Sequence, residues 1–110
     1  MTGARSVRFD FTFGESSGRH AGEHFSAEFA VDIAGERPDG TAGRDRIEFV
    51  HPQGQAPVTA LAVSLAVERL LGLDGKAAPV PGLHFPEMLI DADHALQHLA
   101  AIGVRISRTA

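Results

Sequence analysis

The hydrophobic and polar positions of this sequence change from a period of two to a helical spacing at Pro57. Before Pro57, apolar and polar residues alternate in three segments, which predicts half-buried strands over residues 6–14, 24–34 and 45–51. Short connections between successive strands favour antiparallel pairing. The phenylalanine-rich face of such a sheet needs a cover, and we expect the helices after Pro57 to provide it.

The stretch from Pro57 to Leu71 is the longest helical run, and it is apolar around most of its circumference. Pro57 suits the first helical position and Gly72 suits the stop. Its short length, together with Glu68 and Arg69, excludes a transmembrane helix. A helix that is apolar on most sides must be covered on most sides. We therefore expect a further surface, from another copy or another chain, to help cover it.

A second helix is predicted over residues 92–102, with Asp91 as its N-cap and Gly103 as its left-handed stop. Residues 104–106 alternate and are compatible with a short edge strand. The expected fold is α+β, with an antiparallel sheet of three or more strands and two helices covering one face. The length of 110 residues corresponds to a single domain.

Composition narrows the classes of function. The formal net charge is −4 and no basic cluster is present, so the footprint of a nucleic-acid-binding protein is missing. Cysteine is absent, which excludes disulfides and thiolate metal sites. The first residues contain no apolar core of signal-peptide length. We expect a cytoplasmic protein with neither a nucleic-acid nor a membrane partner.

Two histidines have the spacing of a helical metal site. His94 and His98 are four residues apart and share a helix face, and a third ligand could come from Asp91, His84 or His51. The glutamate of a zinc-protease helix is missing between them. The alternative, an exposed polar helix face, is favoured, and no metal is expected.

No self-sufficient catalytic motif is present, and the catalytic residues stay unassigned. Glu87 lies in a segment bracketed by apolar residues, where a carboxylate could anchor a basic substrate group. The favoured alternative is that Glu87 pairs with an arginine or caps local backbone. Ser64 lacks the glycines of a nucleophile elbow and is interpreted as a packing residue. No Gly-x-Gly-x-x-Gly turn follows a strand, so the chain alone is not expected to bind a dinucleotide.

The order of segments in the second half of the sequence resembles that of a known protein family. Thr59 and Ala60 open a long helix that ends in ERLL, and a Pro/Gly-rich linker leads to GLHFPE at residues 82–87. The last helix then ends in LAAIGV at residues 99–104. This order resembles the C-terminal domain of saccharopine dehydrogenase-like reductases, over about residues 45–106. In that family a Gly-Val-x-x-Pro-Glu-like segment precedes a last helix with a Leu-x-x-x-Gly-Ile-like stop.

The resemblance implies an α+β domain that supplies substrate-site walls and self-association, with Thr59, His84 and Glu87 as substrate-binding residues. In the family a separate Rossmann domain holds NAD or NADP. That domain is not in this sequence, so a cofactor is implied only if a Rossmann partner chain exists. The family often has Gly-Tyr before the Thr-Ala pair, whereas Gln55 follows Gly54 here. A tyrosine contact to substrate is therefore not expected.

Two hypotheses follow for function. The first is the C-terminal domain or a detached subunit of a saccharopine dehydrogenase-like oxidoreductase, which is not catalytic alone. The second is a free-standing module that binds a small ligand or a protein and has no enzymatic activity. Under both hypotheses we expect a homodimer that uses the central helix, the sheet edge or both.

Overall fold

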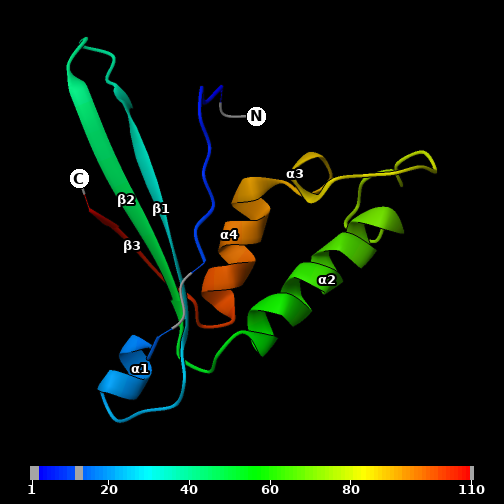
Figure 1. The fold of residues 1–110 in the computed structure, drawn as a ribbon. Helices are drawn as coiled ribbons and strands as arrows, with labels where there is room; N and C mark the ends of the chain where they lie inside the picture. Colours follow the sequence, from blue (N-terminus) through cyan, green and yellow to red (C-terminus); the bar gives the residue numbers. More distant parts are fainter. Residues whose placement is uncertain (1–2, 12–13, 110) are drawn as a thin grey trace.

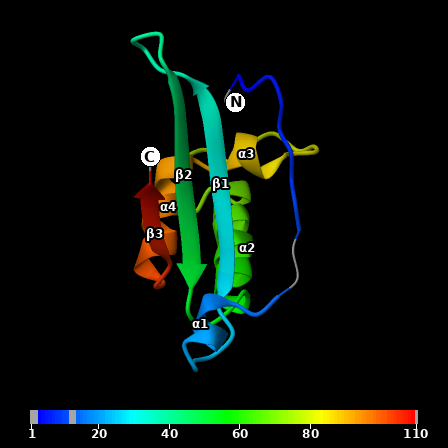
Figure 2. The ribbon, with the colours of Figure 1, turned by 60° about the vertical axis from the view of Figure 1, so that its left-hand side comes forward.

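A computed structural model describes residues 3–11 and 14–109 of the chain. The described residues form an α+β fold, with a three-stranded antiparallel sheet and helices on one of its faces (Figures 1 and 2). The elements are, in order, α1 (Ser17–His20), β1 (Ala27–Glu36), β2 (Ala42–His51), α2 (Ala56–Leu70), α3 (Pro86–Leu89), α4 (Ala92–Ala101) and β3 (Arg105–Thr109).

The sheet has the order β1-β2-β3, with both pairs antiparallel. Its register sets Phe29 of β1 opposite Phe49 of β2, and Phe49 in turn opposite Ile106 of β3. The rings of Phe29 and Phe49 stack with centroids 4.5 Å apart. The expected alternation therefore builds one apolar face, while the opposite face carries Asp32 and Arg46.

The hairpin between β1 and β2 is longer than the sequence pattern predicts, because its turn occupies only residues 37–41. The amide of Arg37 donates to the carbonyl of Thr41 at 2.8 Å, and Gly40 takes a positive φ of 83°. The carboxylate of Asp39 accepts hydrogen bonds from the amide and the hydroxyl of Thr41. These local contacts leave Glu36 and Ala42 free to pair as the last residues of the ladder.

Both main helices have the predicted glycine stop and α4 has the predicted N-cap, whereas α2 begins at Ala56, one residue before Pro57. The α4 helix begins at Asp91, whose carboxylate accepts from the amides of Asp93 and His94. It ends at Gly103, where φ is 102° and the amide of Val104 returns to the carbonyl of Leu99 at 3.0 Å. The α2 helix ends in the same way at Gly72, which has a φ of 68°. Helix α4 runs beside α2 and returns the chain to the sheet (Figure 1).

The core of the described residues is small. Its buried apolar residues are Phe49 of β2, Leu65 of α2, and Val104 just before β3. Phe49 and Val104 lie near the end of the sheet where β2 finishes, whereas Leu65 lines a cleft between α2 and α4. Away from this end the hairpin diverges from the helices (Figure 1), and Phe29, Val31 and Ile33 of β1 are 50%, 42% and 54% exposed.

The prediction of a strand over residues 6–14 is wrong for the part that the structure describes, residues 6–11 and 14; residues 12 and 13 lie outside it. None of these described residues is in a strand, and Val7 and Phe9 are 84% and 85% exposed. The third strand of the sheet is instead β3, where the sequence indicated a short edge strand. An alternating segment becomes a strand only where it pairs with a neighbour, and residues 5–11 form no ladder within the chain.

The other predicted elements are present with shifted bounds. The strand predicted over residues 24–34 is β1, and the one over 45–51 is β2, which begins three residues earlier. The helices predicted over 57–71 and 92–102 are α2 and α4. The expectation that the phenylalanine face is covered is only partly met, since Phe29 is 50% exposed.

The chain exposes much more surface than a folded monomer of its size. Its accessible surface is 8992 Å², whereas a monomer of 11.6 kDa exposes about 5,800 Å². Its radius of gyration is 16.6 Å, against about 13 Å for a compact domain of this length. Its own core is therefore smaller than that of a stable globular unit of equal length.

Candidate functional site

The three candidate substrate-binding residues do not meet in the structure. Thr59 is exposed in the first turn of α2, near the end of β2. His84 and Glu87 lie just before and within α3, which sits near the opposite end of α2 (Figures 1 and 2). Within the described part of the chain, these three residues therefore do not lie around one common pocket.

Local contacts account for two of these residues. The Nε2 atom of His84 lies 2.7 Å from the carbonyl oxygen of Val80, which fixes the loop before α3. Glu87 is exposed in the first turn of α3, where a carboxylate is favourable beside the free amides of a helix start. The side chain of Glu87 makes no capping hydrogen bond to this helix, so the capping role stays a prediction.

The histidine pair of α4 is adjacent, as the four-residue spacing predicts. The ring centroids of His94 and His98 are 4.3 Å apart. The Nδ1 atom of His98 lies 2.9 Å from the carbonyl oxygen of His94. Among residues 3–11 and 14–109, no group of three or more histidine, aspartate or glutamate side chains is placed to hold a metal ion.

A shallow cleft of about 320 Å³ lies between α2 and α4. Arg69 pairs with Asp74 across 3.6 Å and donates to the carbonyl of Ala77 at 2.8 Å, so its charge is already satisfied. The carboxylates of Glu68, Asp91 and Asp93 outnumber the ammonium group of Lys76, so the cleft favours a ligand with a cationic group over an anionic one. The cleft is lined by Leu65, Glu68, Arg69, Asp74, Lys76, Ile90, Asp91, Asp93, His94 and Gln97.

A second hollow, of about 510 Å³, lies between α1 and the turn after β2 and is more open. Its lining residues are Arg19, Gly22, Glu23, His24, Pro52 and Gln53. The four-residue helix α1 beside it is fastened to the start of β1. The hydroxyl oxygen of Ser16 accepts from the amide of Ser26 at 2.9 Å, and Glu28 accepts from the amide of Ser17 at 2.7 Å.

Glu28 is the acceptor at the centre of this fastening. One of its oxygens accepts from the hydroxyls of Ser17 and Ser26 as well as from the amide of Ser17. The hydrogen bond from the Ser17 hydroxyl, followed by that from Ser26, lowers the pKa of the Glu28 carboxyl below its ordinary value. The residue stays exposed, so this arrangement stabilises the ionised carboxylate without enclosing it.

His51 is a buried residue that the sequence pattern placed at the end of the strand over residues 45–51 and among the possible metal ligands. It is 2% exposed at the end of β2. The amide of Gln53 donates to its Nδ1 atom at 3.0 Å, so Nε2 carries the proton and donates to the carbonyl of Ile102 at 3.0 Å. Both ring nitrogens are therefore occupied by backbone groups, and His51 has a structural role.

Many large apolar side chains of the described residues lie in solvent. On β1, Phe29, Val31 and Ile33 point from one face and are 50%, 42% and 54% exposed. On α2, Val63 and Val67 are exposed, on the side opposite the buried Leu65. Further exposed apolar residues are Val7, Phe9, Leu70, Leu71, Leu73, Leu83 and Met88. A soluble monomer rarely exposes so much apolar surface.

None of the described helices is both long and apolar enough to cross a lipid bilayer. No family model, no curated protein and no solved structure matches this chain.

Proposed function

We propose that this chain is a non-catalytic interaction module whose working form is a homodimer. The observation that supports this is the exposed apolar surface of β1 and α2. It accompanies an accessible surface of 8992 Å², about 3,000 Å² more than a monomer of this mass exposes. Burial of apolar surface is the main favourable term in association. A two-fold dimer is the commonest way in which soluble proteins cover such a surface.

The scattered positions of the polar candidates support the same proposal. Thr59 lies in the first turn of α2, whereas His84 and Glu87 lie at or before α3. Enzymes bring their acid, base and binding groups together in one pocket. A module that offers a surface to another chain does not need such a pocket.

Sedimentation equilibrium at micromolar concentration tests the proposal on the unmodified chain. The expected result is twice the mass of one chain, 11.6 kDa, with a monomer only on dilution. A monomer at every accessible concentration would contradict the homodimer.

A second proposal is that the chain is the C-terminal domain or a detached subunit of a saccharopine dehydrogenase-like oxidoreductase. The separation of Thr59 from His84 and Glu87 favours it, because a site completed by a Rossmann partner need not be assembled within one chain. The same apolar surface would then pack against that partner, and NAD or NADP would bind there.

Calorimetric titration with NADH and NADPH tests whether this chain binds a dinucleotide by itself, which neither proposal expects. Neither NADH nor NADPH is expected to bind this chain alone, because it lacks the glycine-rich turn that places backbone N–H groups against a pyrophosphate. Micromolar binding of either one would contradict both proposals. A neighbouring reading frame whose Rossmann-domain product co-purifies with this chain would favour the second.

A further inference from the structure

The sheet has a long open edge. In the order β1-β2-β3, the strand β1 is at the edge, is ten residues long, and pairs only with β2 among the described residues. Natural proteins usually shorten, charge or cover such an edge, because its free N–H and C=O groups pair readily with another strand. The β1 edge carries Glu28, Asp32 and Glu36, and it has no basic residue. A strand that completes it should therefore bring positive charge.

Residues 5–11, here called the N-terminal arm, have the pattern of such a strand. Apolar and polar residues alternate along the arm, and Val7 and Phe9 are 84% and 85% exposed. The arm carries Arg5 and Arg8 against a single acidic residue, Asp10. It runs down the β1 side of the molecule, opposite in direction to β1, without joining the sheet (Figures 1 and 2).

We propose that the N-terminal arm of a second copy adds to the free edge of β1 as an antiparallel strand, and that the two copies exchange their arms reciprocally. This inference rests on the proposed homodimer and names the surfaces that form it. Exchange of an identical element between two copies is a common route to a symmetric dimer.

The apolar face restricts the register of this pairing. Alternation has a period of two, so a shift by one residue would turn the apolar side chains of the arm to the polar face of β1. Pairing Phe9 with Val31 keeps apolar residues together on the face that α2 and α4 share. The cross-strand pairs on this face are then Val7 with Ile33, Phe9 with Val31, and Phe11 with Phe29.

The charges on the polar face favour this register over the registers shifted by two residues. With Phe9 opposite Val31, Arg8 is opposite Asp32 and Asp10 is opposite Ala30. A shift of two residues in one direction places Asp10 opposite Asp32, and a shift in the other direction places it opposite Glu28. Like charges directly opposite each other destabilise a strand pair, so both shifted registers are disfavoured.

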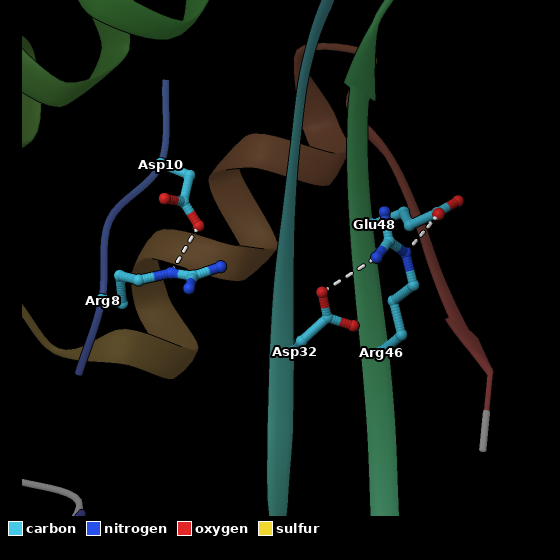
Figure 3. Close-up of polar contacts among 5 residues, drawn as sticks. All are labelled: Arg8, Asp10, Asp32, Arg46 and Glu48. Carbon is cyan, nitrogen blue, oxygen red and sulfur yellow. Dashed lines mark hydrogen bonds and ion pairs between the residues drawn. The ribbon is translucent and has the colours of Figure 1, made fainter. Parts of the chain in front are cut away.

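The existing ion pairs of Asp32 and Arg8 leave both side chains able to form the proposed contact. Asp32 accepts from Arg46 at 2.9 Å, and Arg46 also donates to Glu48 at 2.8 Å (Figure 3). Arg46 thus divides its charge between two carboxylates. Arg8 pairs with its neighbour Asp10, at 2.7 Å on an exposed segment, where such a pair contributes little stability. Arg8 can reach Asp32 from the open side of β1 at small cost.

The simplest alternative is that the β1 edges of two copies pair with each other, and the negative charge of β1 disfavours it. That seam would hold Glu28, Asp32 and Glu36 from each copy without a basic residue on either β1 strand. Closure by the chain's own arm would leave the exposed Val63 and Val67 of α2 in solvent. The surface in excess is about 3,000 Å² per chain, more than one short strand covers, and an obligate homodimer buries about 1,000–2,500 Å² on each chain.

Disulfide trapping tests the inference, and the chain contains no cysteine that could interfere. Single-cysteine variants Phe9→Cys and Val31→Cys are mixed and brought to equilibrium in a glutathione redox buffer. The expected product is a disulfide-linked heterodimer whose bond joins positions 9 and 31 by mass spectrometry. The matched control replaces Val31→Cys with Ala30→Cys, whose side chain points to the opposite face, and should give at most a small fraction of that product.

Each other outcome overturns the inference. A disulfide that forms only within the double variant Phe9→Cys/Val31→Cys would show that the arm closes on its own chain. Self-linking of Val31→Cys alone would show pairing between two β1 edges. The absence of any disulfide between positions 9 and 31 would show that the arm does not pair with β1. If sedimentation still gives a dimer in these cases, the proposed function stands and only the arm exchange fails.

Discussion

The Nε2 atom of His51 donates a hydrogen bond to the carbonyl oxygen of Ile102 over 3.0 Å, which ties the end of β2 to the end of α4. The contact spans half of the chain and lies beside the small core formed by Phe49 and Val104. Because Nδ1 accepts from Gln53, the ring bridges two backbone segments that are distant in the sequence. His51 therefore holds the end of α4 against the end of β2.

The first prediction is that His51→Ala destabilises the fold. The substitution leaves the amide of Gln53 and the carbonyl of Ile102 without their buried partner, and each such group costs about 1–3 kcal/mol. We expect a loss of about 2–4 kcal/mol in the free energy of unfolding, measured by urea denaturation at a fixed protein concentration. The control is His20→Ala at an exposed position, which should change the free energy of unfolding little. An equal loss in both variants would contradict the bridging role of His51.

The second prediction concerns the stability that Glu28 contributes at acidic pH. The hydrogen bonds of Ser17 and Ser26 lower the pKa of Glu28, so the ionised form is the one that the fold stabilises. The stability that it contributes is fully present above the ordinary pKa of 4.5 and is lost as the pH falls through the lower folded value. Because Glu28 is exposed, the effect is at most about 1 kcal/mol.

Amide hydrogen exchange measures this effect locally. Protection of the Ser17 amide, whose acceptor is Glu28, should fall as the pH goes below that range, after correction for intrinsic rates. In Glu28→Gln the protection should be weaker and nearly independent of pH. Constant protection of the Ser17 amide down to strong acid in the unmodified chain would contradict the prediction.

The third prediction is that Val67→Glu weakens self-association before it unfolds the chain. Val67 is 45% exposed on the outer side of α2, and Leu61 is less exposed, so the structure identifies Val67 as the outward residue of the two. A buried carboxylate in the dimer contact should raise the dissociation constant at least about tenfold, equivalent to about 1.4 kcal/mol.

The control for this variant is Gln97→Glu, which adds the same charge at an exposed and already polar position of α4. Sedimentation equilibrium and far-ultraviolet circular dichroism are measured on both. An unchanged dissociation constant for Val67→Glu would remove α2 from the contact, and lost helicity would show that the substitution acts on folding instead.

Sequence reasoning identified the elements whose signals are local. The stop at Gly103 and the cap at Asp91 depend on neighbouring residues, and both have the predicted geometry. Period two at Phe29 and Phe49 likewise identified β1 and β2. The same pattern at Val7 and Phe9 gave no strand, because strand formation depends on a partner edge that the local sequence does not specify.

The candidate site was less predictable for the same reason. Thr59, His84 and Glu87 were grouped by a resemblance in segment order, and order alone does not determine which ends of a helix meet. His51 had no local signal for burial, since its partner Ile102 is distant in the sequence. The exposed surface of α2 was the part that the sequence did indicate, through a helix that is apolar on most sides.

The last prediction isolates the charge pair of the proposed arm exchange. In the proposed register Arg8 of one copy is opposite Asp32 of the other, and the two-fold symmetry gives two such pairs per dimer. Cross-strand pairs of opposite charge contribute about 0.2–1 kcal/mol each, and like charges destabilise similarly. Arg8→Glu loses both attractive pairs and makes two repulsive ones, so it should raise the dissociation constant about fourfold or more.

The control variant Arg5→Glu makes the same change in net charge, but position 5 would be opposite Gly35, which has no side chain. It should weaken the dimer clearly less than Arg8→Glu. Asp32→Lys added to Arg8→Glu restores opposite charges across the seam and should recover part of the affinity, although this substitution removes the bond that Asp32 makes with Arg46. Equal effects of both arginine variants, with no recovery in the double variant, would mean that only net charge matters and that Arg8 does not face Asp32.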